Sequence, residues 1–217
     1  MARIMHFYHS IHTHPEAPKK GVTRQGISYV MLLLATGLRR QEAMSLPWTD
    51  VDLDAKSLVV RDPKNGIDHW VPLSTLTEHI LMDQMQRSKG SYWVFPARSK
   101  SGHMTEPTSQ LNKIAQATGT KFNLHDCRRT FATHAKVNGA DHEMAPRALN
   151  HKSGGSITDQ YIADRIGFLR PVFEAVAKQY YYYLDVGTGK AAYDKEGWLP
   201  TGYDIDAIPA GVEKVDF

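Results

Sequence analysis

The chain has 217 residues, of which 41% are hydrophobic and 23% are charged, as in an ordinary globular protein with one well-buried core. No stretch reaches the ~18 uninterrupted apolar residues of a membrane-spanning helix, and no secretory signal is evident at the N-terminus, so we expect no membrane partner. The single cysteine, Cys127, excludes an intrachain disulfide and is consistent with a reducing compartment.

Charge is distributed unevenly along the chain. The formal net charge is only +3, but residues 185–217 carry seven acids against three lysines, which leaves about +7 on the first 184 residues. A basic body with an acidic end is compatible with a polyanionic partner, although many proteins without such a partner share it.

The first 21 residues contain several histidines but no recognisable ligand framework for a metal, because no cysteine lies nearby. We therefore expect no bound metal and interpret residues 1–21 as an exposed linker or the end of a helix. The histidines are His6, His9, His12 and His14.

A helical pattern begins at Val22, because apolar residues recur at the spacing of three and four that marks a buried helix face. Gly37 provides a helix stop, and Arg39 follows it closely. A second short helix is expected to carry Glu42 before Pro47. The apolar residues of the first helix are Ile27, Val30, Met31 and Leu34.

Two β-prone runs at 58–61 and 69–73 predict a hairpin. Asn65 and Gly66 form a strong turn signal between them, because both residues tolerate positive φ. Lys64 is therefore expected at or near the hairpin tip.

A capping box of Thr75 and Glu78 predicts the start of the next helix, with Leu76, Ile80 and Met85 on its inner face. A basic loop at 97–104 follows a short extended segment. Four more helices are expected at 107–119, 125–138, 141–149 and 169–184, before a loosely ordered acidic tail at 185–217. This inventory predicts an α+β fold, mainly helical with one small antiparallel sheet.

Several polar residues match the requirements of phosphoryl transfer, although each is a weak signal alone. Two arginines, Arg39 and Arg128, can bind the non-bridging oxygens of a phosphodiester with paired hydrogen bonds and keep their charge near neutral pH. His125 shares a helix face with Arg128. A tyrosine hydroxyl becomes a nucleophile when nearby positive charge or a base helps to remove its proton, and a lysine or histidine can supply the proton for the departing oxygen. This chemistry requires neither a metal nor another cofactor.

Five segments occur in the order and at sensible separations for the catalytic domain of a tyrosine recombinase of the phage-integrase type, which the chain resembles over about residues 22–183. The segments are A-T-G-L-R-R-Q-E-A at 35–43, D-P-K-N-G at 62–66, H-D-C-R-R-T-F-A-T-H at 125–134, L-N-H-K at 149–152 and T-D-Q-Y at 158–161. The resemblance implies a catalytic domain at 22–184 and site-specific cleavage and rejoining of DNA.

The resemblance also implies a role for each matching residue. Tyr161 would form a 3′-phosphotyrosine bond with one DNA strand, and Lys64 would protonate the departing 5′ oxygen. Arg39 and Arg128 would bind the scissile phosphate. His125 would assist proton transfer.

In the same resemblance, His151 would donate a hydrogen bond to the phosphate. Glu42 and Asp126 match positions that orient other groups. Contacts with the DNA backbone are expected from basic residues near these motifs: Arg40, Arg98, Lys100, Arg129 and Lys152.

The implied partners are a double-stranded DNA attachment site, further copies of the chain in a tetrameric synapse, and accessory DNA-bending proteins. The implied location is the cytoplasm of a bacterium or a phage-infected host. The helix at 169–184 could exchange between neighbouring protomers, as the resemblance suggests, or pack on its own domain. Half of the tyrosine run 180–183 is expected in the core and half at a surface or subunit contact.

The chain departs from the family pattern in two ways. Cys127 stands where the family usually has leucine, and either residue can be buried. Only about 20 residues precede the catalytic region, whereas such recombinases normally have an N-terminal core-binding domain, so residues 1–21 are expected to be a linker to that missing domain or its remnant.

Three alternatives remain open at this point. Lys56 competes with Lys64 as the lysine of the site. A type IB topoisomerase uses a similar set of arginine, lysine, histidine and tyrosine, and a non-catalytic DNA-binding module could keep the pocket as a scaffold.

Overall fold

The computed structural model describes residues 1–13, 21–61, 63, 66, 68–140, 144–150 and 162–187. The α-helices of this part of the chain are α1 (Ala2–Thr13), α2 (Arg24–Thr36), α3 (Arg40–Met44), α4 (Thr75–Ser88), α5 (Thr108–Thr118), α6 (Leu124–Val137), α7 (Met144–Ala148) and α8 (Ile162–Gly187). The 3₁₀-helix η1 (Trp48–Asp50) precedes the strands β1 (Val51–Asp52), β2 (Ser57–Val60) and β3 (His69–Pro72). The predicted α+β class, mainly helical with a small antiparallel sheet, is confirmed.

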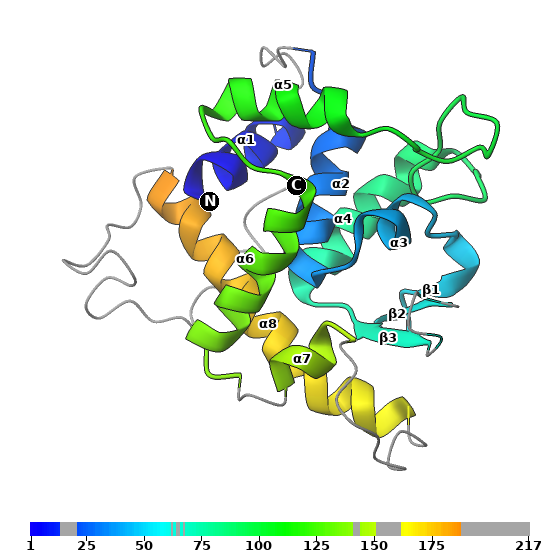
Figure 1. The fold of residues 1–217 in the computed structure, drawn as a ribbon, viewed down its shortest axis with the longest axis vertical. Helices are drawn as coiled ribbons and strands as arrows, with labels where there is room; N and C mark the ends of the chain where they lie inside the picture. The colour runs from blue at the N-terminus through cyan, green and yellow to red at the C-terminus, as the bar shows by residue number, and fades with distance from the viewer. Residues whose placement is uncertain are drawn as a thin grey trace.

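Helix α2 runs through the middle of the molecule, and α1, α4, α5, α6 and α8 pack against it (Figure 1). All its residues from Gly26 to Thr36 are buried, which explains why apolar residues extend beyond one face of the helix. Its N-cap is Thr23, whose side chain accepts a hydrogen bond from the Gly26 amide. The helix ends at Gly37, as predicted.

The three strands form an antiparallel sheet in the order β1-β2-β3 at one side of the helical body (Figure 1). Val60 pairs with His69, so the β2–β3 connection leaves the sheet at that pair. Helix α8 packs against β3, and Arg170 donates a hydrogen bond to the Leu73 carbonyl at 3.1 Å. The predicted strands are confirmed, whereas Lys64 and Asn65 lie outside the described residues.

Helix α8 is longer than the predicted 169–184, and its predicted core residues are buried: Leu169, Val172, Phe173 and Val176. Tyr180, Tyr181 and Tyr182 are also buried. The expectation that half of the tyrosine run covers the core is therefore too low. Burial removes these three rings from the surface at which bases could stack.

Residues 1–21 are expected to be an exposed linker or the end of a helix, and most of the described part forms the packed helix α1. Ile4, Met5, Tyr8 and Ile11 are buried in the common core, and the helix packs against α8, α5 and α2. The apolar stripe at three- and four-residue spacing explains this packing. Among the described residues, no group of three potential metal ligands is found. His14 lies outside them.

The N-terminus of α4 differs from the predicted capping box. Ser74 is the N-cap, and both the amide and the hydroxyl of Thr75 donate hydrogen bonds to Glu174 on α8. Glu78 instead lies in an ion pair with a lysine. Met85 is 45% exposed, which corrects its assignment to the inner face of α4.

The predicted helices at 107–119, 125–138 and 141–149 correspond to α5, α6 and α7. The predictions for residues 151–161 and 188–217 concern positions outside the described residues. Within the part of the chain that the structure describes, no helix is both long enough and apolar enough to cross a membrane.

Candidate active site

The turn after α2 brings three distant segments together. Gly37 adopts φ 66°, in the left-handed region that favours glycine. A Cβ atom at this position would lie 2.6 Å from Leu149 Cδ2 and 2.7 Å from Phe131 Cδ1. The absence of a side chain therefore allows α6 and the end of α7 to approach the turn that precedes Arg39.

Arg39 is the N-cap of α3 and is held by Glu42. Its guanidinium Nη1 donates to Glu42 Oε1, and its backbone amide donates to Glu42 Oε2, each at 2.7 Å. The Glu42 side chain is only 8% exposed, whereas that of Arg39 is 31% exposed. One buried carboxylate thus fixes both the backbone and the side chain of an arginine that still reaches solvent.

Helix α6 positions Arg128 through a well-defined start. Asn123 is its N-cap and accepts a hydrogen bond from the Asp126 amide, while Asp126 Oδ2 accepts one from the Asn123 amide at 2.9 Å. The helix begins at a fixed residue as a result. Arg128 follows one turn later and is buried, with 8% exposure.

The guanidinium of Arg128 is oriented by backbone carbonyls. Nη1 donates to the Gly37 carbonyl at 2.6 Å, and Nη2 donates to the Leu149 carbonyl. Burial is the main cause that lowers the Arg128 pKa to about 10, with a further contribution from the charge of Arg39 and an opposing one from Glu42. The group therefore remains positively charged at neutral pH, beside a second guanidinium.

Arg39 lies between two cavities, whereas Arg128 lines one of them. One cavity of about 450 Å³ is lined by Arg39, Arg40 and Arg128 together with His125. A neighbouring cavity of about 610 Å³ is also lined by Arg39 and Arg40, and its wall includes Arg61. Three arginines and a histidine line the smaller cavity, which suits it to an anion, whereas the wall of the larger one also contains the carboxylates of Glu42 and Asp50.

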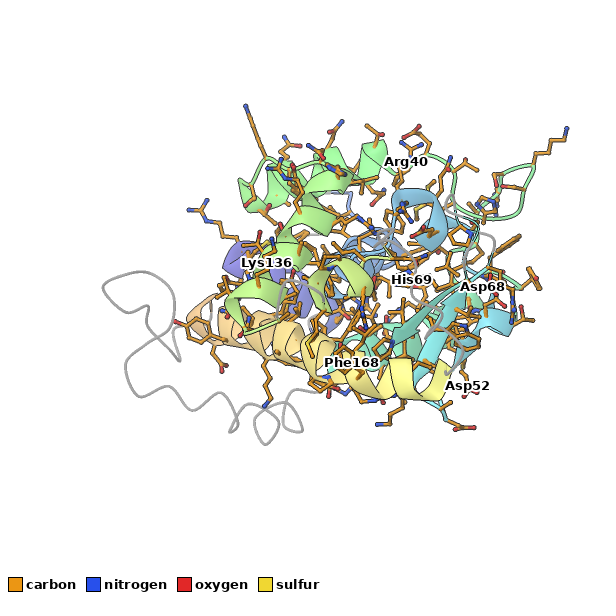
Figure 2. The ribbon with its side chains drawn as sticks, turned by 60° about the horizontal axis from the view of Figure 1, so that its bottom comes forward. Arg40, Asp52, Asp68, His69, Lys136 and Phe168 are labelled. Atoms are coloured by element: carbon orange, nitrogen blue, oxygen red, sulfur yellow. The ribbon has the colours of Figure 1, made fainter. Side chains whose placement is uncertain are left out.

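The remaining predicted contacts lie at the surface. Arg40, Arg98, Lys100 and Arg129 are exposed. Figure 2 shows Arg40 at the start of α3. Lys56, the competitor of Lys64, forms an ion pair with a glutamate of α4 at 3.1 Å.

Five of the eight predicted reactive or orienting groups are thus described. The fold brings Arg39, Glu42, His125 and Arg128 to one place, and Asp126 caps the start of α6. Lys64, His151, Lys152 and Tyr161 lie outside the described residues. The carbonyl acceptors at Gly37 and Leu149 could not be predicted from the sequence, because every residue has a carbonyl group and no residue type marks the ones that bind Arg128. The Asn123 cap was detectable, since it stands three residues before Asp126.

The fold is similar to that of solved integrases and recombinases. The integrase of mycobacterium phage Brujita aligns with a TM-score of 0.56 at 18% identity, over 71% of this chain and 52% of that one. XerH recombinase aligns with a TM-score of 0.55 at 21% identity, over 69% and 45%. Both likenesses show the architecture of site-specific recombinases and integrases.

The family model described as phage integrase family matches residues 1–166, and the chain belongs to that family. Prophage integrase IntF of Escherichia coli K12 is 30% identical over 154 residues, which cover 69% of this chain and 33% of IntF. Tyrosine recombinase XerD of Bradyrhizobium diazoefficiens is 32% identical over 136 residues, covering 55% and 42%. The chain thus spans less than half the length of these relatives, and the family predicted from the motifs is confirmed.

Proposed function

We propose that this chain is the catalytic part of a site-specific DNA recombinase, which cleaves and rejoins strands through a 3′-phosphotyrosine intermediate. The observation that carries the proposal is the convergence of Arg39 and Arg128 from separate elements on one open cavity. Two like charges side by side repel each other, and a bound phosphate would offset that repulsion.

The arginines are suited to stabilise the transition state for attack on a phosphodiester. Negative charge grows on the non-bridging oxygens, and guanidiniums that are already oriented need not reorganise to meet it. Glu42 fixes Arg39, and two carbonyls fix Arg128, so the donors are oriented before the substrate arrives. Asp126 has an indirect role, because its hydrogen bond with the Asn123 amide fixes the start of α6, the helix that carries Arg128.

In the proposed reaction the Tyr161 oxygen forms a bond to phosphorus while the bond from phosphorus to the 5′ oxygen breaks. Lys64 protonates the departing 5′ oxygen, and His125 assists proton transfer. His151 donates a hydrogen bond to the phosphate. Because the phosphotyrosine keeps the energy of the broken bond, a 5′ hydroxyl from another strand reverses the step without ATP, a metal or another cofactor.

The proposed substrate is a double-stranded DNA attachment site. The solved XerH recombinase is bound to its difH substrate, which supports a DNA partner for a chain of the same fold. Four exposed cationic residues would contact the DNA backbone, namely Arg40, Arg98, Lys100 and Arg129. We assign the same role to Lys152. The proposal includes a tetrameric synapse, accessory DNA-bending proteins and action in the cytoplasm.

The test is covalent capture on a pool of nicked duplexes with a randomised centre. The nick lets a short fragment diffuse away after cleavage, so the protein stays attached to DNA and migrates slowly in a denaturing gel. We expect an adduct with the natural chain and none with Tyr161→Phe. Tyr92→Phe is the matched control, because Tyr92 is 57% exposed and has no role in the proposed reaction.

Other outcomes would overturn the proposal. An adduct that persists in Tyr161→Phe would assign the nucleophile elsewhere. DNA binding without any adduct would indicate a non-catalytic module, and relaxation of supercoiled plasmid without sequence preference would indicate a topoisomerase. Sequencing the DNA recovered from the adducts would give the target.

A further inference from the structure

His69 is a buried polar residue to which the proposed reaction assigns no role. It is 1% exposed and lies at the start of β3, opposite Val60 on β2. Its Nε2 lies 3.1 Å from the carbonyl oxygen of Ala148, the last residue of α7. Figure 2 shows His69 well inside the outline of the molecule, whereas its neighbour Asp68 lies further out.

The Ala148 carbonyl fixes the proton of His69. A carbonyl oxygen only accepts hydrogen bonds, so Nε2 must carry a hydrogen and donate it. Ala148 ends a helix, where carbonyl groups have no partner within the helix and need one elsewhere. His69 therefore supplies, from the sheet, a hydrogen bond to the last turn of α7.

The next residue connects this contact to the candidate active site. The Leu149 carbonyl accepts the hydrogen bond from Arg128 Nη2, and the Leu149 amide donates back to α7. The Ala148 carbonyl and the Leu149 amide belong to one planar peptide unit, and the Leu149 carbonyl belongs to the next one, two rotatable bonds further on. The contact with His69 therefore restrains the chain one peptide unit before the carbonyl that binds Arg128.

We propose that His69 is a positioning residue for Arg128, holding the Ala148–Leu149 segment in the orientation in which the Leu149 carbonyl binds the guanidinium. Its effect on DNA cleavage rests on the proposed function, but its effect on the arginine does not. The second anchor of Arg128, the Gly37 carbonyl, comes from a different segment. Loss of His69 thus loosens the carbonyl of Leu149, one of the two described acceptors of Arg128, and the guanidinium can then turn about its hydrogen bond to the Gly37 carbonyl.

The structural test is NMR of the full chain with ¹⁵N-labelled arginine, which reports exchange of guanidinium protons with water. Arg128→Lys identifies the Arg128 signals by their disappearance. In His69→Phe, which keeps a ring but removes the donor, we expect exchange of the Arg128 protons to rise about tenfold or more. In His69→Gln, which keeps an N–H donor, we expect the slow exchange to be largely retained.

A matched control separates positioning from general loss of stability. Val71 lies on the same strand and is fully buried, so Val71→Ala weakens the same sheet without touching Ala148 through a polar group. Thermal unfolding verifies that each variant is folded. If His69→Phe leaves Arg128 exchange unchanged, or if Val71→Ala accelerates it equally, His69 is an ordinary core residue and the proposal is overturned.

The catalytic consequence is measured by single-turnover cleavage of the nicked duplex recovered from the adducts. We expect His69→Phe to lower the cleavage rate about tenfold or more while DNA affinity changes little, and His69→Gln to restore most of the rate. If affinity and rate fall together, His69 does not act through Arg128. If the natural chain forms no adduct, the proposed function fails, and the exchange experiment still decides the role of His69.

Discussion

The two arginines of the site are held in opposite ways, although they line one cavity. Arg39 is partly exposed and pairs with a carboxylate at 2.7 Å, so much of its charge is balanced within the protein. Arg128 is buried, and its hydrogen bonds to Gly37 and Leu149 go to neutral carbonyls. Burial and the charge of Arg39 lower its pKa to about 10, yet it stays charged at neutral pH.

This difference assigns different tasks to the two residues. The ion pair with Glu42 orients Arg39, but the carboxylate also weakens the attraction between Arg39 and an incoming phosphate. Carbonyl groups orient Arg128 and leave its positive charge available. We infer that Arg128 supplies most of the attraction for the negative charge that grows on the phosphate during cleavage, and that Arg39 mainly fixes the position of the phosphate.

The largest effect is expected at Arg128. Arg128→Lys keeps the charge but cannot donate to two carbonyls and a phosphate in the planar geometry of a guanidinium. Loss of one preorganised donor lowers cleavage rates by about 10²–10³-fold. Single-turnover cleavage measures this, with Arg87→Lys on α4, where the guanidinium pairs with Asp83, as the control. A loss below about threefold would show that orientation at this position matters little.

Gly37→Ala tests whether the shared turn supports both arginines. The positive φ costs about 1–2 kcal/mol, and crowding against Leu149 and Phe131 adds about 1–3 kcal/mol, so we expect about 2–5 kcal/mol of lost stability. Gly90→Ala is the control, because Gly90 also has positive φ but no atom within 4 Å of the added Cβ. Urea unfolding compares the two variants, and equal losses would contradict the close approach.

Glu42→Ala tests the other side of the comparison. The carboxylate accepts hydrogen bonds from both the amide and the guanidinium of Arg39, and a bond to a charged group is worth about 1.5–3 kcal/mol. We expect a fall of about tenfold in cleavage rate, smaller than the loss at Arg128 because only orientation is removed. A larger loss than for Arg128→Lys would reverse the assignment of tasks.

His134 is a second buried basic residue of α6, and its intrinsic pKa is far lower than that of Arg128. Burial lowers the His134 pKa to about 4, whereas the pKa of a histidine in the unfolded chain is about 6.5. As the pH falls, the unfolded chain therefore binds this proton before the folded protein does. Stability contributed by the neutral ring is therefore present above about pH 6.5 and is lost as pH falls toward 4. His134→Phe should reduce this acid sensitivity with the smallest change at neutral pH, as measured by urea unfolding at several pH values.

Much of the fold was predictable because local signals agreed with the final packing. The periodic apolar residues of α2 with its glycine stop, and the buried face of α8, each matched the structure. The docking of α1 was not predictable from its histidines, because burial of Ile4 and Tyr8 depends on the distant helix α8. The cap at Ser74 was missed because Thr75, the next residue, is an equally good candidate.

The candidate site was predictable in its reactive residues and not in their supports. Arg39 and Arg128 could be selected because their side-chain chemistry and the surrounding motifs are visible in the sequence. The groups that orient Arg128 are backbone oxygens, and His69 reaches Ala148 only through tertiary packing. The roles of all these residues stay predictions, and Lys64, His151 and Tyr161 also lie outside the described residues.

A double-mutant cycle tests most directly whether Arg39 and Arg128 act on one phosphate. Single-turnover cleavage of the nicked duplex is measured for the natural chain, Arg39→Ala, Arg128→Ala and the double variant. If both guanidiniums bind one phosphate, the double variant loses less than the combined single losses, with a coupling of about 1 kcal/mol or more. Losses that add within about 0.5 kcal/mol would place the two arginines on separate groups and contradict the account.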